Sequence, residues 1–281
     1  MSRGINNVLL IGTLARNPDL KYTPKGIAVL EFTVAGDSRN IGSDGLERNV
    51  PFYQRSSIYG KQAEALAETL KAGDAVLLEG SLEYQAWETE DGTKRSKVGV
   101  RTSRLESLQS GWRNAALVTD AIGGLRLPDA VNEVTILGNL TKDAVSRVTP
   151  NGNNVTNLSV AVNESWRDEN NVWQNKAHYV DVTVWGDMAE LCANLTKGES
   201  VLVAGRLTND SWTDIHGQKR TATKIEASRL EMLMRAPKPQ EAAPVQVPAP
   251  QRTTGKAAPK TSSKGRQAPP NQNAMTEDMP F

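Results

Sequence analysis

The chain repeats itself after about 125 residues, and this repeat constrains the fold more than any other feature of the sequence. Matching residues lie 126 positions apart early in each copy and 125 apart later. The pairs at 126 are Asn6 and Asn132, Gly12 and Gly138, Leu14 and Leu140, Thr23 and Thr149, Pro24 and Pro150, and Gly26 and Gly152. The pairs at 125 are Gly73 and Gly198, Gly80 and Gly205, Leu82 and Leu207, Trp87 and Trp212, Gly92 and Gly217, Lys94 and Lys219, and Arg95 and Arg220. Because solenoid repeats are far shorter, this period indicates two copies of a whole domain.

The repeat and the composition together divide the 281 residues into four parts. We expect a first domain over residues 1–108 and a second over residues 131–234. Residues 109–130 are expected to form a partly ordered connector that packs on the domains. Residues 235–281 hold nine of the 14 Pro and no Trp or Tyr. With so little apolar material to offset the entropy of ordering, residues 235–281 are predicted to be a disordered tail.

Short alternating apolar runs in each copy predict an all-β fold. The first strand is predicted at Val8–Ile11, with its counterpart at Val134–Leu137. A helix near Gln62–Leu70 corresponds to one at Met188–Leu195. A hairpin turn at Asp91-Gly92 precedes the last strand. Five strands with one short helix between the third and the fourth are the order of an oligonucleotide-binding (OB) barrel, so we predict two tandem OB folds.

Strand phase separates the core from the outer face, because successive side chains point to opposite sides of a strand. In the second copy Val180, Val182 and Val184 form the core face, which places Tyr179 and Trp185 on the outer face. By the same alternation the outer face also carries Tyr53, Arg55, Tyr59 and Trp87 in the first copy, and Arg206 and Trp212 in the second. An aromatic cluster that is forced out of the core is a candidate binding surface.

Basic side chains accompany these rings in both copies. They are Arg55, Lys61, Lys94 and Arg95 in the first copy, and Arg206, Lys219 and Arg220 in the second. Flat rings beside cations suit the unpaired bases and phosphates of a single strand, where stacking contributes roughly 1–3 kcal/mol per base. A lone outward Trp would more simply cover the barrel against the connector, a loop or a partner subunit. A cluster that recurs in both copies favours nucleic-acid binding.

The remaining chemically versatile residues predict no catalytic or metal site. Trp166 and Trp173 fall in a polar stretch that predicts a loop, where Trp166 is either a local packing anchor or a binding residue. His178 and His216 lie at no motif spacing and are predicted in solvated positions, whereas Cys192 is predicted to be buried. One Cys and two His fall short of four zinc ligands. Since the sequence also contains no phosphate loop or nucleophile elbow, we expect no metal, no cofactor and no enzymatic activity.

The formal net charge of +1 by itself argues against a nucleic-acid partner. The charge is uneven, however, because residues 235–281 carry +4 while residues 1–234 carry 26 Lys and Arg against 29 Asp and Glu. Affinity for nucleic acid must therefore come from a local basic and aromatic face. The single Cys fits a reducing compartment, and no apolar run approaches the roughly 18 residues of a membrane span. We expect a cytoplasmic protein with no signal peptide and no membrane partner.

Several motifs resemble those of the bacterial single-stranded DNA-binding protein family. They are Arg3-Gly4-Ile5-Asn6, the run Val8–Gly12, Lys21-Tyr22-Thr23-Pro24-Lys25-Gly26, Glu164-Ser165-Trp166-Arg167-Asp168, Trp185-Gly186, and Trp212-Thr213-Asp214 followed by Gly217. Two OB domains in one chain are similar to the subfamily from radiation-resistant and thermophilic bacteria, whose homodimers display four OB folds. The resemblance implies a nucleoid-associated homodimer that binds single-stranded DNA without sequence preference.

The resemblance also assigns roles to particular residues. The base-stacking positions are Trp166, Tyr179, Trp185 and Trp212 in the second copy, and Tyr53, Tyr59 and Trp87 in the first. Asn40 stands where the second copy has Trp166, so the two domains are expected to contribute unequally. The chain ends in Thr276 followed by Glu277, Asp278, Met279, Pro280 and Phe281. This end resembles the acidic tip with which the family docks replication, recombination and repair proteins.

Three alternatives remain at this point. An RNA- or tRNA-binding OB protein would share the fold and the stacking chemistry. A pure interaction scaffold would use the barrels for protein contacts. An OB-fold enzyme is a distant third, because the sequence offers no catalytic constellation.

Overall fold

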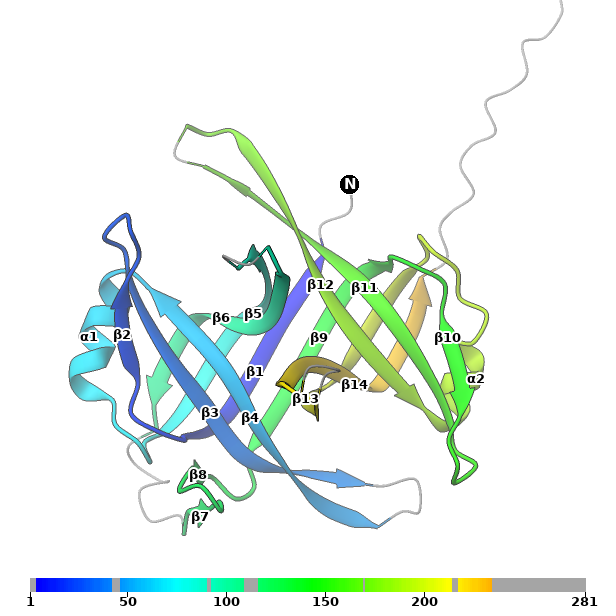
Figure 1. Ribbon diagram of the computed structural model, residues 1–281, viewed down its shortest axis with the longest axis horizontal. Coiled ribbons are helices and arrows are strands. Elements are labelled where there is room, and N and C mark those ends of the chain that lie inside the picture. Colours follow the sequence, from blue (N-terminus) through cyan, green and yellow to red (C-terminus); the bar gives the residue numbers. More distant parts are fainter. Residues whose placement is uncertain are drawn as a thin grey trace, which may run out of the picture. The chain divides into compact units, whose positions relative to one another are not determined.

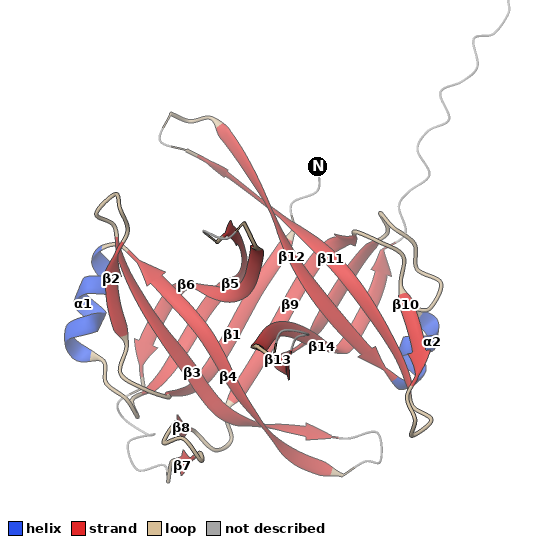
Figure 2. Cartoon of the chain, viewed as in Figure 1, coloured by secondary structure: helices blue, strands red, loops and turns tan. Residues whose placement is uncertain are grey.

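The computed structural model describes residues 4–41, 46–89, 92–108, 116–168, 170–213 and 217–233. The predicted tail at 235–281, with its Glu277–Phe281 tip, lies outside the described residues, and so does His216. The described chain is built from strands with two short helices (Figure 2). This confirms the prediction of an all-β protein with two tandem OB folds.

The first barrel closes from five strands. They are β1 (Ile5–Leu14), β3 (Ala28–Ile41), β4 (Glu47–Tyr59), β5 (Ala75–Glu88) and β6 (Lys94–Ser107). β1 pairs with β3 and β5, β3 pairs with β4, and β6 pairs with β5 and, in parallel, with β4. The helix α1 (Lys61–Thr69) connects β4 to β5, and a short strand β2 (Asp19–Tyr22) lies beside β3 (Figure 1). The helix therefore lies between the third and fourth barrel strands, as predicted.

The second barrel repeats this plan. Its five strands are β9 (Val131–Leu140), β11 (Asn154–Arg167), β12 (Trp173–Trp185), β13 (Ser200–Thr213) and β14 (Lys219–Leu233). The short β10 (Val145–Val148) corresponds to β2, and α2 (Gly186–Leu191) corresponds to α1. The helix α2 begins and ends earlier than predicted, and a turn follows it as far as Asn194.

The duplication is visible at the level of individual hydrogen bonds. The side chain of Asn6 donates to the carbonyl oxygen of Leu82 at 2.9 Å and accepts from the Leu82 amide at 2.8 Å. In the second barrel Asn132 makes the same pair of bonds to Leu207, both at 2.9 Å. An Asn is conserved between the copies because its amide satisfies both polar groups of one backbone residue in the facing strand.

The two barrels share one continuous sheet, because their first strands pair with each other. β1 and β9 run antiparallel, from Ile5 opposite Leu137 to Ile11 opposite Val131, and Val8 lies opposite Val134. The described residues of both barrels thereby belong to a single sheet of twelve strands. Backbone hydrogen bonds therefore fix the position of one barrel against the other.

The core follows the predicted strand phase. Val180, Val182 and Val184 are buried, while Tyr179 and Trp185 on the same strand are exposed. The first barrel differs at two of the equivalent positions, where Gln54 and Ser56 are buried among apolar residues. The division between core face and outer face is confirmed in both barrels.

The described part of the connector packs on the first barrel. The strands β7 (Val118–Thr119) and β8 (Leu125–Arg126) form a small hairpin. Leu127 is fully buried, and its carbonyl oxygen accepts the amide of Asp37 at 2.9 Å. A Cβ at Gly36 would lie 2.2 Å from that of Ala130, so only glycine admits the connector this closely.

Two local predictions were wrong. Trp166 and Trp173 lie in strands β11 and β12, which continue as a long hairpin where the polar sequence had predicted a loop. His178 is buried and not solvated, since only 4% of its surface is exposed. The strands extend beyond the barrel in both places, and at His178 the extension contacts the other domain through the backbone amide of Tyr84.

Candidate nucleic-acid interface

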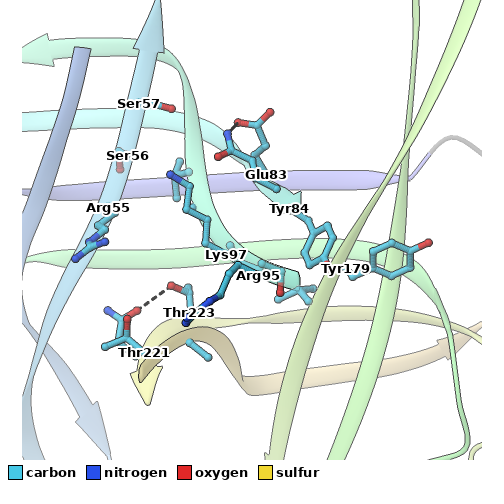
Figure 3. A pocket seen from close by; sticks show the side chains of 18 of the residues that line it. Arg55, Ser56, Ser57, Glu83, Tyr84, Arg95, Lys97, Tyr179, Thr221 and Thr223 are labelled. Carbon is cyan, nitrogen blue, oxygen red and sulfur yellow. Dashed lines mark hydrogen bonds between the residues drawn. The ribbon is translucent and has the colours of Figure 1, made fainter. Parts of the chain in front are cut away.

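A groove of about 1270 Å³ lies between the two barrels. Its lining comes from β3, β4, β5 and β6 of the first barrel and from β12, β13 and β14 of the second, with a few residues from neighbouring elements. The groove brings together eight of the sequence-predicted binding residues, namely Tyr53, Arg55, Tyr59, Lys94, Arg95, Tyr179, Trp212 and Arg220. Figure 3 labels Arg55, Arg95 and Tyr179 among the side chains that line it. We call this feature the inter-barrel groove.

The inter-barrel groove has a local excess of positive charge. Six of its lining residues are basic: Arg16, Arg55, Lys94, Arg95, Lys97 and Arg220. Three are acidic: Glu31, Glu83 and Asp181. Glu31 and Glu83 are neutralised by Lys21 at 2.7 Å and Lys176 at 2.9 Å. The groove is thus basic although residues 1–234 as a whole have more acids than bases.

Two tyrosines from different barrels meet in this groove. Tyr84 on β5 and Tyr179 on β12 place their ring centroids 5.3 Å apart at an interplanar angle of 84° (Figure 3). Tyr179 is 47% exposed, so much of its surface remains open to the groove. An edge-to-face contact of this kind is a favourable arrangement of aromatic rings.

Sequence reasoning did not single out Tyr84. Its phase is that of Leu82, which is buried in the first barrel, so alternation assigns Tyr84 to the core. β5 continues beyond the closed barrel as far as Glu88, and there the inward face meets the second domain. The missed signal is the length of the strand, because phase identifies core residues only where a strand belongs to the closed barrel.

His178 and Lys176 of β12 fix the edge of the groove to β5. The Nδ1 atom of His178 accepts the backbone amide of Tyr84 at 3.1 Å, and its Nε2 lies 2.9 Å from Oε2 of Glu164. Lys176 binds Glu83. Burial raises the pKa of Glu83, but hydrogen bonds from Lys176 and Gln85 and the charge of Lys176 outweigh burial and leave it below the ordinary value.

Tyr53 occupies the position equivalent to Tyr179 but has a different environment. Its hydroxyl donates to Asp120 at 2.7 Å and accepts from Arg126 at 3.0 Å, and both partners belong to the connector. The guanidinium carbon of Arg126 lies 5.9 Å from the centre of the ring. Burial raises the pKa of the Tyr53 hydroxyl above its ordinary value. The connector therefore holds Tyr53, whereas no described hydrogen bond holds the hydroxyl of Tyr179.

Both barrels match one family of known proteins. The model of the family described as Single-strand binding protein family matches residues 5–108 and 131–233, which is most of the chain. The chain belongs to the single-strand binding protein family. Both matched segments coincide with the two barrels.

Relatives and solved structures in the single-strand binding protein family match over long stretches. A single-stranded DNA-binding protein of Deinococcus radiodurans is 48% identical over 279 residues, covering 98% of this chain and 92% of the relative. One of Thermus aquaticus is 43% identical over 237 residues, 84% of this chain and 88% of the relative. A crystal structure of a deletion mutant of the Thermus aquaticus single-stranded DNA binding protein superimposes with a TM-score of 0.67 at 37% identity. The superposition covers 86% of this chain and 100% of the Thermus aquaticus chain.

Two of the predicted binding residues line a different cavity. Trp185 and Arg206 border a space of about 1120 Å³, together with Arg39 and Asn40. Arg206 is ion-paired with Glu226 at 2.8 Å and is mostly buried. Asn40, the counterpart of Trp166, thus borders the same space as Trp185 and does not line the inter-barrel groove.

Four further predicted residues line neither cavity. Trp87 and Trp166 are exposed on the extended hairpins β5–β6 and β11–β12. Lys61 is the first residue of α1, and Lys219 is the first residue of β14. The two exposed rings lie on the same two hairpins that carry Tyr84 and Tyr179.

The described residues offer neither a metal-binding cluster nor a membrane-spanning helix. They contain no group of three or more His, Cys, Asp or Glu that could hold a metal ion. Cys192 is buried, and burial raises the pKa of its thiol. No described helix is both long and apolar enough to cross a membrane.

Proposed function

We propose that this chain is a non-catalytic, sequence-tolerant binder of single-stranded DNA that coats exposed strands. The inter-barrel groove carries the proposal, because it combines aromatic rings with a basic lining. Rings stack on any base, while cations neutralise phosphates, so this chemistry needs no particular sequence. The proposed contact residues are Tyr53, Arg55, Tyr59, Lys94, Arg95, Tyr179, Trp212 and Arg220 in the groove, and Lys61, Trp87, Trp166, Trp185, Arg206 and Lys219 outside it. The names of the relatives, which are single-stranded DNA-binding proteins, support this proposal.

Intrinsic tryptophan fluorescence tests the proposal directly. Titration with oligothymidylate at low salt should quench the fluorescence, because bases stack on the exposed indole rings. Affinity should fall with salt, with a log–log slope of about −0.7 for each phosphate neutralised. The absence of both quenching and binding at low salt would refute the proposal.

A matched pair of tryptophan variants tests the groove itself. Trp212→Ala should weaken binding by roughly 1–3 kcal/mol, the usual contribution of one stacked base. Trp173→Ala is the control, since Trp173 is also exposed, lines neither cavity, and packs against the Arg167 guanidinium at 5.0 Å. Equal affinity of the two variants would remove Trp212 from the proposed contact set.

Competition between nucleic acids separates DNA from RNA as the ligand. Oligothymidylate and oligouridylate of equal length should be compared at the same salt concentration, because both stack and both carry phosphates. We expect the DNA strand to bind more tightly. Tighter binding of the RNA strand would favour an RNA-binding role.

We further propose that two chains associate into a homodimer with four OB folds. With about 4–16 nucleotides per OB fold, such a dimer would cover roughly 16–64 nucleotides. Its mass in solution, measured with and without oligothymidylate, tests this assembly. A monomeric mass in both conditions would contradict it.

Residues 235–281 are proposed to be a tail that recruits replication, recombination and repair proteins. The proposal rests on the terminal sequence Glu277, Asp278, Met279, Pro280 and Phe281, in which an apolar end follows two acids. Deleting residues 276–281 should abolish binding of such proteins and leave affinity for oligothymidylate intact. We also propose domain limits of 1–108 and 131–234, a connector at 109–130, and a cytoplasmic, nucleoid-associated location.

A further inference from the structure

The tyrosine pair in the inter-barrel groove joins the two domains at one point. Tyr84 comes from the first barrel and Tyr179 from the second, and both line the groove. Groups other than the Tyr84 ring hold this junction, because the backbone amide of Tyr84 binds the imidazole of His178 and the Glu83 carboxylate binds Lys176. The side chain of Tyr84 is not needed for either bond. Its ring is therefore available for a role other than joining the barrels.

Unpaired cations line the same groove as the ring pair. Lys97 on β6 is exposed, and in the β5–β6 ladder it lies opposite Gln85, the residue after Tyr84. Among the described residues Lys97 and Arg55 have no ion pair, although both line the groove. Figure 3 shows Lys97, Arg95 and the two tyrosines around the same hollow. A groove that holds both a ring pair and free ammonium and guanidinium groups has the chemistry that a single strand of bases and phosphates requires.

The equivalent contact between the barrels is built differently. We call it the second crossing, and the contact at Tyr84 and Tyr179 the first. Asn209 occupies the position of Tyr84, and Tyr53 occupies that of Tyr179. The side-chain amide of Asn209 donates to the backbone carbonyl of Tyr53 at 2.6 Å, so the barrels contact each other there as well. That crossing has one ring in place of two, and the connector binds its hydroxyl. Only the crossing with Tyr84 offers an open pair of rings.

We propose that Tyr84 and Tyr179 form a bridging subsite, where a nucleobase stacks as one single strand passes from the first barrel to the second within the same chain. This inference rests on the proposed function and assigns Tyr84 and Lys97 to it. Lys97, which lines the same groove, neutralises a phosphate of that strand. The two OB folds of a chain then act as one continuous site with a defined crossing point.

Substitutions at Tyr84 in the full-length protein test the subsite. Affinity for an oligothymidylate of about 30 nucleotides, long enough to cover two OB folds, is measured by fluorescence titration. Tyr84→Leu, which keeps a large apolar side chain, should weaken binding by about 5- to 150-fold, the equivalent of one lost stack. Tyr84→Phe should bind like the wild type, because it keeps the ring. Asn209→Ala at the matched position should also bind like the wild type.

A second measurement keeps the test independent of folding defects. Lys97→Met leaves the rings in place and should make the log–log salt slope shallower by about 0.7, the loss of one phosphate contact. Oligonucleotides with 5-iododeoxyuridine, crosslinked by light and mapped by mass spectrometry, should attach to the peptide containing Tyr84 or Tyr179.

The outcomes separate this inference from the proposed function. If the wild type binds oligothymidylate but Tyr84→Leu binds equally well, the bridging subsite is refuted and the proposed function stands. Crosslinks at Tyr53 with none at Tyr84 or Tyr179 would refute the subsite in the same way. If the wild type does not bind the oligonucleotide, the proposed function itself fails.

Discussion

The imidazole of His178 in the second barrel accepts the backbone amide of Tyr84 in the first barrel at 3.1 Å. Because Nδ1 accepts this bond, the ring proton must lie on Nε2, which donates to Glu164 at 2.9 Å. The buried imidazole thus connects the two barrels at the edge of the groove. The equivalent residue of the first barrel is Phe52, which is also buried, so this connection exists at only one of the two crossings.

Replacing His178 by Phe, the residue at the equivalent position of the first copy, should lower the free energy of unfolding. In His178→Phe the Tyr84 amide loses its acceptor, and an unsatisfied buried donor costs about 1–3 kcal/mol. His178→Asn is the control, since its amide oxygen can take the place of Nδ1 as acceptor. The free energy of unfolding, measured by denaturant titration, should be lower for His178→Phe than for His178→Asn. Equal values would show that the hydrogen bond contributes little.

Acid should weaken the neighbouring contact between Glu83 and Lys176. The pKa of Glu83 in the folded protein lies below its ordinary value of 4.5, so the ionised carboxylate stabilises the fold. This contribution is complete above pH 4.5 and is lost as the pH falls through the lower pKa of the folded state. Glu83→Gln should therefore show a smaller loss of stability between pH 7 and acid than the wild type.

A residue on the same strand provides the comparison for this pH dependence. Glu79 on β5 lies 3.6 Å from Arg104 but is more exposed than Glu83. Surface pairs of this kind contribute little to stability. Denaturant midpoints of Glu79→Gln should follow the wild-type pH profile. The prediction for Glu83 is wrong if its Gln variant loses as much stability in acid as the wild type does.

The connector should bind less firmly when the hydroxyl of Tyr53 is removed. Tyr53→Phe keeps the ring but deletes the hydrogen bonds to Asp120 and Arg126, so residues 116–130 should become more susceptible to proteolysis. Affinity for oligothymidylate should stay equal or rise, because the ring is retained and released from its partners. Tyr179→Phe is the matched control and should leave proteolysis unchanged. Equal cleavage of both variants would mean that other contacts hold the connector.

Strand phase predicted most of what lies inside each barrel. The alternation of Val180, Val182 and Val184 is a local property of one strand, and it assigns Tyr179 to the outer face without knowledge of the fold. The duplication likewise predicted two barrels, because equal spacing of turn glycines demands equal folds. The tandem OB architecture therefore follows from local patterns.

Contacts between the barrels could not be predicted in this way. The roles of Tyr84 and His178 depend on the pairing of β1 with β9, and no periodicity within one copy encodes that pairing. The same holds for the groove, which combines residues more than 100 positions apart, such as Arg55 and Tyr179. A polar residue such as His178 looks solvated until the strand from the other domain that buries it is known.

The two barrels have different residues at one equivalent buried position, Gln54 in the first and Val180 in the second, and exchanging them tests the duplication. Gln54 is buried where the second barrel has Val180, and its Oε1 has no hydrogen-bond partner among the described residues. Gln54→Val replaces a buried amide by an apolar side chain of similar volume and should raise the free energy of unfolding by about 1 kcal/mol. Val180→Gln places an amide in the apolar core of the second barrel and should lower it by about 1–3 kcal/mol. Denaturant titration of both variants checks the prediction, and destabilisation of both by similar amounts would show that Gln54 is satisfied in its barrel.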